Sequence, residues 1–252
     1  MKTAISTLKL IVFECLAIWM MGCQDARAAV EKSAQRIYAE SVSATGCIYR
    51  DGIRNGSCFL FDSAKGYVIG NFHTLADAEE RITVSMGNER IQRPVEILFA
   101  DPSRDISILK VNGIAGRIAK AIPISKRKQI YVGEKVYAIG HPGVSENALL
   151  DGIISTQIFW GSNAGAGGIT LSYTAYYHQS FANTLRGWGG VSGGVILDSY
   201  GEAIGVHYAG ASNGLSLARP IWDFLPAIKQ VVRPHLIVEA RVFDKRRVQA
   251  SS

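Results

Sequence analysis

Ser192 stands among glycines in the segment Gly190-Val191-Ser192-Gly193-Gly194. Such a turn suits a nucleophile, because glycine at position 190 removes side-chain bulk where backbone N–H groups must face a developing oxyanion. Gly193 and Gly194 let neighbouring backbone approach closely. The pattern favours acyl transfer through serine, although a glycine-rich loop between two strands would also contain it.

A serine hydroxyl is a weak nucleophile near neutral pH, so this chemistry needs a base and a group that orients the base. Among the five histidines, His73 follows the strand-like run 67–72 and precedes a short helical turn at 74–77, which predicts an exposed strand end. The rival is His141, which lies between glycines and beside Pro142. That context indicates a turn and a surface or capping role, so we predict His73 as the base.

The carboxylate that orients the base must be firmly held. Asp105 precedes the alternating run Ile106–Val111, a strand that would anchor it against the core. Asp101 is expected to cap a turn, and Asp151 lies just before a glycine in what reads as another turn. We therefore pair Asp105 with His73. The histidines are scattered without metal-ligand spacing, so we expect no metal and no other cofactor.

The elements that position these residues are mostly strands. Hydrophobic residues make up 48% of the 252-residue chain, enough for a sizeable core. A helix over 31–41 and another over 220–232 flank brief apolar runs separated by glycine-rich turns, with a domain crossing near residue 120. We predict an all-β protein of two barrels with a C-terminal helix. The predicted strands are Cys58–Phe61, Tyr67–Gly70, Ile82–Met86, Val95–Phe99 and Ile106–Val111, then Ile130–Ile139, Leu150–Phe159, Ile169–Tyr177, Gly194–Leu197, Glu202–Tyr208 and Leu215–Ala218.

The N-terminus reads as an export signal. Two lysines precede the apolar stretch Leu10–Met21, and Ala26-Arg27-Ala28 follows as a small-x-small cleavage pattern, so we place cleavage after Ala28. The alternative is a lipoprotein processed at Cys23. The predicted organisation is a signal peptide over 1–28, barrel halves over 29–120 and 121–235, and a polar tail over 236–252.

Cleavage there leaves Cys47 and Cys58 as the two mature cysteines, a pair that suits a disulfide in an oxidising compartment. Asp-Gly and Asn-Gly steps between them predict turns that bring two strands side by side. We expect a Cys47–Cys58 disulfide, with two buried thiols as the alternative.

The net charge of +6 only weakly favours anionic partners. The basic clusters 126–128 and 245–247 are not interleaved with aromatic residues, as a base-stacking platform would be. We expect protein or peptide substrates, no nucleic acid, and no membrane-spanning segment after the leader.

Several motifs in order resemble the chymotrypsin-like serine proteases, most closely bacterial trypsin-like enzymes of the HtrA type. The order of histidine, aspartate and serine matches that clan and differs from subtilisins and α/β-hydrolases. The motifs are Gly56-Ser57-Cys58-Phe59, Gly66-Tyr67-Val68-Ile69-Gly70-Asn71-Phe72-His73, Asp101-Pro102-Ser103-Arg104-Asp105-Ile106-Ser107-Ile108-Leu109, Ala138-Ile139-Gly140-His141-Pro142 and Gly190-Val191-Ser192-Gly193-Gly194.

The resemblance implies a double six-stranded β-barrel with the active site between the barrels. It assigns Ser192 as the nucleophile, His73 as the base and Asp105 as the group that orients the imidazole. The backbone N–H groups of Gly190 and Ser192 would form the oxyanion hole. The family usually has Asn or Asp where this chain has Val191, which keeps a second hypothesis open: a protease-fold protein that binds peptides without turnover. No PDZ module is expected after the terminal helix.

The run 203–210 is similar to the pocket-lining strand of glutamyl endopeptidases, which place a histidine where His207 stands. An imidazole there can donate a hydrogen bond to a Glu or Gln side chain at P1, the substrate residue before the cleaved bond. Arg186 would add positive charge to the same pocket. The alternatives are a strand histidine bonded to its neighbours and an exposed loop arginine.

Overall fold

The computed structural model describes residues 30–76, 81–118, 120–143, 145–162, 170–178, 190–210 and 215–233. Several sequence predictions therefore fall outside the described residues: the signal peptide over 1–28 with Cys23, Arg186, the basic cluster 245–247 and the tail 236–252. Within the described part of the chain, no helix has the length and apolarity needed to cross a membrane.

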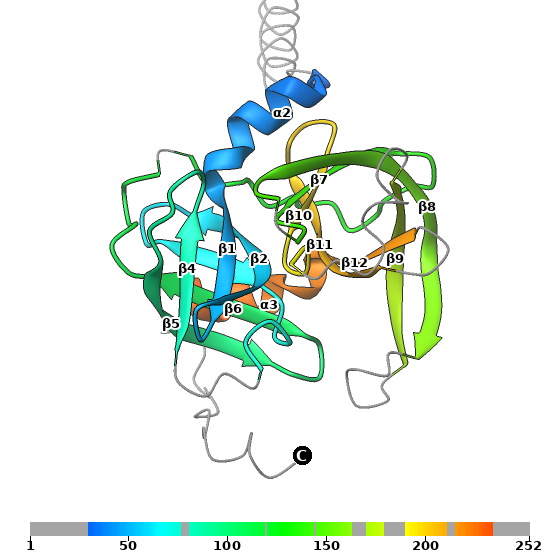
Figure 1. Cartoon of the computed structure of the whole chain (residues 1–252). Coiled ribbons are helices and arrows are strands. Elements are labelled where there is room, and N and C mark those ends of the chain that lie inside the picture. Colours follow the sequence, from blue (N-terminus) through cyan, green and yellow to red (C-terminus); the bar gives the residue numbers. More distant parts are fainter. Residues whose placement is uncertain are drawn as a thin grey trace, which may run out of the picture. The chain divides into compact units, whose positions relative to one another are not determined.

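Two closed six-stranded antiparallel barrels make up the fold (Figure 1), which confirms the predicted all-β double barrel. The first runs in the order β1-β2-β3-β6-β5-β4 and the second in the order β10-β11-β12-β9-β8-β7. The strands of the first are β1 (Thr45–Arg50), β2 (Ile53–Asp62), β3 (Tyr67–Gly70), β4 (Ile82–Met86), β5 (Arg93–Asp101) and β6 (Ile106–Val111). Those of the second are β7 (Lys135–Gly140), β8 (Ala148–Ser162), β9 (Thr170–His178), β10 (Val195–Asp198), β11 (Ala203–Gly210) and β12 (Leu215–Pro220).

One hydrophobic cluster joins the barrels. Fully buried side chains of β2, β3 and β6, such as Phe59, Ile69 and Leu109, belong to the same cluster as Val195 and Val206 of the second barrel. Burying a side chain of this size contributes about 1.5–3 kcal/mol. The apolar runs of the sequence thus account for both the strands and their association.

Helices cover both ends of the described chain. Helix α2 (Ala34–Ser41) starts later than predicted because the Ser33 hydroxyl caps it by accepting a hydrogen bond from Arg36 N (3.3 Å); the short 3₁₀ helix η1 (Val42–Ala44) follows it. Helix α3 (Leu225–Val232) also starts later, because β12 continues to Pro220 and the short helix η2 (Ile221–Asp223) intervenes.

Strands β1 and β2 form the hairpin predicted from the Asp51-Gly52 step, where both residues have positive φ, 51° and 83°. The predicted disulfide is wrong, because Cys47 and Cys58 are free, buried thiols. The register explains this: Cys47 lies opposite Ser57, while Cys58 lies opposite Gly46. Since neighbouring residues of a strand point to opposite faces, the two sulfurs lie on different faces of the ladder.

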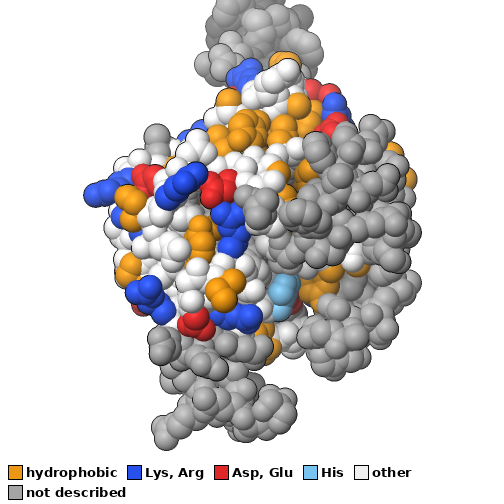
Figure 2. All heavy atoms as spheres, viewed as in Figure 1, with side chains coloured by type: hydrophobic (Ala, Val, Ile, Leu, Met, Phe, Trp, Pro, Cys, Tyr) orange, Lys and Arg blue, Asp and Glu red, His pale blue; other side chains and the backbone are white. Residues whose placement is uncertain are grey.

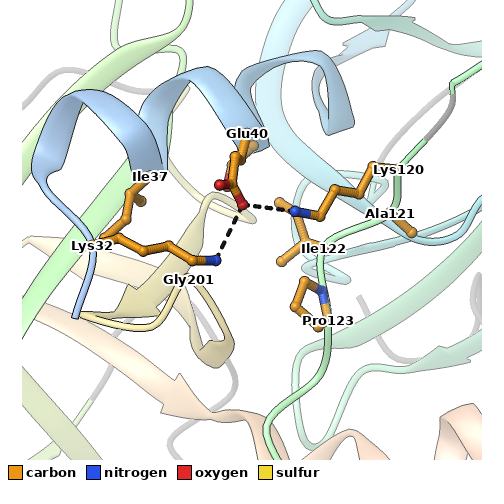
Figure 3. Close-up of a pocket in the computed structure, with 9 residues that line it drawn as sticks. Lys32, Ile37, Glu40, Lys120, Ala121, Ile122, Pro123 and Gly201 are labelled. Carbon is orange, nitrogen blue, oxygen red and sulfur yellow. Dashed lines mark hydrogen bonds and ion pairs between the residues drawn. The ribbon is translucent and has the colours of Figure 1, made fainter. Parts of the chain in front are cut away.

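The chain crosses from the first barrel to the second at residues 122–123. Ile122 N donates to Leu60 O (2.9 Å) in β2, and Pro123 O accepts from Ala203 N (2.8 Å) in β11. Helix α2 is fastened to this crossing by Glu40, whose carboxylate contacts Lys120 (2.7 Å) and Lys32 (3.1 Å) (Figure 3). The same carboxylate also contacts Arg36 (2.8 Å) within the helix. Lys32 N in turn donates to Ser199 O (2.8 Å) of the second barrel.

Charged side chains of both signs are interspersed with apolar ones over the described surface in view in Figure 2. Arg127, from the basic cluster 126–128, is engaged by Glu134 (2.9 Å) and Asp198 (3.4 Å). These ion pairs give Arg127 a structural role between the crossing segment and the second barrel.

Hydrogen bonds from Lys120, Arg36 and Lys32 lower the pKa of Glu40 from 4.5 to about 2. A carboxylate whose pKa is lowered on folding adds stability above its unfolded pKa and loses that contribution as pH falls through the folded value. We therefore expect stability to decline between about pH 4.5 and pH 2, and Glu40→Gln to remove this part of the decline. At pH 7 the substitution should cost about 1 kcal/mol or less. Urea unfolding across this pH range measures both effects, and Glu96→Gln, which breaks a single exposed pair with Lys110, is the matched control.

Candidate active site

His73 and Asp105 are joined by two hydrogen bonds. The ring Nδ1 of His73 lies 2.8 Å from Asp105 Oδ2, and the backbone N of His73 donates to Asp105 Oδ1 (2.7 Å). The Asp105 side chain is 4% exposed, whereas that of His73 is 44% exposed. The buried carboxylate therefore fixes the ring at Nδ1 and leaves Nε2 as the nitrogen available for chemistry.

A buried polar network holds the Asp105 backbone. Asp105 has a positive φ of 54°, a conformation that a non-glycine residue adopts only at a cost of about 1–3 kcal/mol. The side chain of Asn71, which is fully buried, donates to Asp105 O (3.2 Å), and the Asn71 carbonyl accepts from Thr74 Oγ1 (2.7 Å) and Ser107 Oγ (3.1 Å). The residues on both sides of His73 thus position its partner.

Ser192 lies on a turn that only glycine-rich sequence can form. Gly194 N donates to Val191 O (2.8 Å) across the turn, and Gly190 and Gly193 have φ of 105° and 89°. A β-carbon at Gly193 would lie 1.9 Å from Ser57 O, and one at Gly190 would lie 2.5 Å from His141 O. These approaches give the physical reason for both glycines.

The turn is tied to both barrels. Ser57 N of β2 donates to Ser192 O (2.7 Å). In β11, the backbone oxygen of His207 accepts from Gly193 N (2.9 Å), and its backbone nitrogen donates to Gly194 O (2.8 Å). The backbone that carries the serine hydroxyl is therefore held from two sides.

Tyr208 contacts both Ser192 and His73. Ser192 Oγ donates to Tyr208 O (3.1 Å), and the Tyr208 ring meets the His73 ring edge-on, with centroids 5.8 Å apart. A β-carbon at Gly56 would contact Thr74, next to His73, as well as Ser192 O. Ser192 and His73 thus both contact Tyr208 and lie in the same region. Among the described contacts, however, the Ser192 hydroxyl bonds to Tyr208 O and not to His73.

The N–H groups of Gly190 and Ser192 donate no hydrogen bond to any described residue. Val191 between them is 8% exposed, and a β-carbon at Gly140 would lie 3.2 Å from its Cγ1. Burial against β7 explains why an apolar residue is accommodated at this position.

The other candidates have different surroundings. His141 is not a surface residue as expected, because it is 2% exposed. Its Nδ1 accepts from Asn147 N (3.2 Å), and burial lowers the pKa of His141 to about 4. Asp101 caps a turn as predicted, accepting from Ser103 N (3.0 Å) and Arg104 N (3.1 Å). Asp151 lies within β8, paired with Tyr137, and not in a turn.

His207 is 7% exposed and lies opposite Ala218 of β12, while Arg186 is outside the described residues. Among the described residues, no three His, Cys, Asp or Glu side chains group as metal ligands would.

The trypsin-like peptidase domain matches residues 56–206, a span that contains His73, Asp105 and Ser192. The chain belongs to the trypsin-like peptidase family. Its relatives include a probable periplasmic serine endoprotease, DegP-like, of Ectopseudomonas mendocina, 33% identical over 184 residues that cover 70% of this chain and 35% of the relative. Serine endoprotease DegS of Escherichia coli K12 is 31% identical over 153 residues, which cover 60% of this chain and 39% of DegS.

Solved structures are similar as well. The serine endoprotease from Yersinia pestis superimposes with a TM-score of 0.62 at 26% identity, covering 82% of this chain and 69% of that chain. Deg5 superimposes with a TM-score of 0.61 at 25% identity, covering 79% of this chain and 93% of the Deg5 chain. These likenesses confirm the resemblance to HtrA-type serine proteases. The chain spans little more than a third of the length of the two curated relatives named above.

Sequence reasoning missed two residues that contact the site. Asn71 is a polar residue inside the otherwise apolar run before His73, and that interruption was the available signal. Tyr208 gave no such signal, because its contact with His73 joins the two barrels and depends on their docking.

Proposed function

We propose that this chain is an exported serine endopeptidase that hydrolyses peptide bonds through His73, Asp105 and Ser192. The single observation that carries the proposal is the His73–Asp105 pair, with 2.8 Å between Nδ1 and Oδ2, beside Ser192. Tyr208 links the two, because its ring contacts the His73 ring and its carbonyl accepts from the Ser192 hydroxyl. A base oriented by a buried carboxylate, close to a serine on a glycine turn, is the arrangement that acyl transfer requires.

In the proposed reaction, Ser192 Oγ attacks the scissile carbonyl carbon while His73 Nε2 takes its proton. Asp105 holds the ring and stabilises the imidazolium that forms. The N–H groups of Gly190 and Ser192 stabilise the oxyanion, each donor contributing roughly a hundredfold or more in turnover. His73 then protonates the leaving amine, and water, activated by the same base, hydrolyses the acyl-enzyme.

The Ser192 side chain must move before the proposed reaction can begin. Ser192 Oγ bonds to Tyr208 O, so the hydroxyl must turn toward His73 before it can transfer its proton. A rotation about one side-chain bond is fast compared with turnover. The resting bond to Tyr208 therefore does not oppose catalysis.

We expect the purified protein to react with a fluorophosphonate probe at Ser192 and to cleave an unfolded protein substrate. Ser192→Ala should abolish labelling and lower kcat by about a millionfold, because it removes the nucleophile. Gel fluorescence and peptide release measure these outcomes, with Ser199→Ala, a serine in the β10–β11 turn, as the control. A folded wild-type protein that neither labels nor cleaves, yet binds peptides, would establish the binding module instead.

We further propose that His207 and Arg186 favour Glu or Gln at P1. His207 supports this because its backbone is hydrogen-bonded to Gly193 and Gly194, which places it directly beside the nucleophile turn. A ring N–H of an imidazole can donate to a carboxylate or amide oxygen, and a charged donor makes the stronger bond. The claim for Arg186 rests on its positive charge and its position shortly before Ser192 in the sequence.

Peptides that differ only at P1 test this specificity. We expect kcat/KM for Glu or Gln to exceed that for Ala by at least about tenfold, because a pocket built to hydrogen-bond a substrate group rejects a side chain that lacks that group. His207→Ala should bring the ratio close to one, and Arg186→Ala should lower it for Glu only. A wild-type preference for small aliphatic P1 residues would contradict the proposed pocket.

Export to the periplasm or the exterior is proposed from the leader, with cleavage after Ala28. The name of the relative from E. mendocina, a periplasmic endoprotease, supports this assignment. Mass spectrometry of protein recovered from the periplasm of an expressing bacterium should give Ala29 as the first residue. A diacylglyceryl-modified Cys23 at the N-terminus would instead establish a lipoprotein.

A further inference from the structure

Ser57 lies where three parts of the molecule meet. It belongs to β2 of the first barrel, is 1% exposed, and its Oγ donates to Gly190 O (2.5 Å) in the nucleophile turn. The same oxygen accepts from His141 N (3.0 Å), just after β7 of the second barrel. One hydroxyl thus satisfies both a carbonyl and an N–H group at the junction of the barrels.

The Gly190 carbonyl needs such a partner. Gly190 has no side chain and a φ of 105°, so its own conformational preferences do not fix the orientation of the Gly190–Val191 peptide. A carbonyl that loses a buried hydrogen bond tends to turn toward another donor, because leaving it unsatisfied is costly. Rotation of this peptide turns the Val191 N–H together with the carbonyl, and the accompanying changes in ψ of Gly190 and φ of Val191 displace the N–H groups of Gly190 and Ser192 on either side of it.

The hydrogen bonds of the Ser57 hydroxyl are supported by further contacts on the far side of His141. His141 is held from its other side, because its Nδ1 accepts from Asn147 N (3.2 Å). Asn147 Nδ2 donates to Gly87 O (3.1 Å), which returns the network to the first barrel. Ser57 N also donates to Ser192 O (2.7 Å), so the backbone and side chain of Ser57 hold both ends of the segment Gly190–Ser192.

We propose that Ser57 is a positioning residue for the oxyanion hole: its hydroxyl fixes the Gly190 carbonyl and thereby aims the N–H groups of Gly190 and Ser192 at the developing oxyanion. This proposal rests on the proposed peptidase function. Ser57 acts through the turn and does not touch His73 or the reacting atoms, so its removal lowers kcat while KM and the shape of the pH profile stay unchanged.

Ser57→Ala removes the hydroxyl, and Ser57→Thr restores one. Ser125→Ala is the matched control, since Ser125 is also 1% exposed and its hydroxyl, among the contacts of the described residues, accepts a single long bond from Arg127 N (3.4 Å). We expect Ser57→Ala to lower kcat and the rate of fluorophosphonate inactivation about 10- to 100-fold, with KM within about twofold. Ser57→Thr should recover most of the loss, and Ser125→Ala should show none.

A crystal structure of each variant separates this proposal from the proposed function. We expect the Gly190 carbonyl to turn away from residue 57 in Ser57→Ala and to keep its orientation in Ser57→Thr. An unmoved carbonyl together with wild-type kcat overturns the positioning role, although the protein is then still a peptidase. If the wild-type protein fails to label, the proposed function fails, and the orientation of the carbonyl alone decides whether Ser57 positions the turn.

Discussion

The proposed active-site arrangement depends on the close approach of Gly193 to Ser57. A β-carbon at residue 193 would lie 1.9 Å from the Ser57 carbonyl oxygen, far inside van der Waals contact, so any other residue would push the nucleophile turn away from β2. The same approach lets Ser57 N reach Ser192 O. Steric exclusion at one backbone position thus sets the distance between the element that carries the serine and the barrel that carries the base.

The two barrels supply different parts of the proposed chemistry. The first provides a buried carboxylate and a half-exposed imidazole, both fixed by hydrogen bonds that stay within that barrel. The second provides the turn with Ser192 and the strand with His207 and Tyr208. Because the proposed base and the proposed nucleophile come from different barrels, the geometry between them depends on how the barrels dock, and the shared hydrophobic cluster fixes that docking.

Much of the fold could be predicted from the sequence, because apolar runs bounded by glycine report strand positions directly. The pairing of Asp105 with His73 also followed from local pattern, since each residue borders a recognisable strand. Predictions failed where register or context decided the outcome. The Cys47–Cys58 disulfide was excluded by a one-residue offset in pairing that no composition reveals, and Asp151 was assigned to a turn although a glycine follows it inside β8.

The contacts that cross between barrels could not be predicted at all. Ser57 appeared in a recognised motif without a role, because its partners Gly190 and His141 come from distant parts of the chain. The burial of His141 was missed for the same reason. A turn sequence such as Gly-His-Pro-Gly indicates an exposed loop, whereas here the docked barrels enclose it.

Helix α3 has a consequence for how the two barrels fold. Phe224 and Ala227, next to and within α3, belong to the cluster that contains the core of the first barrel, and Lys65 Nζ of that barrel donates to Val232 O (3.3 Å). The first barrel therefore cannot complete its interior until α3, from the opposite end of the described chain, has docked on it. A fragment that ended after the first barrel would expose the apolar surface that α3 covers, so the folding of the two halves is coupled through this helix.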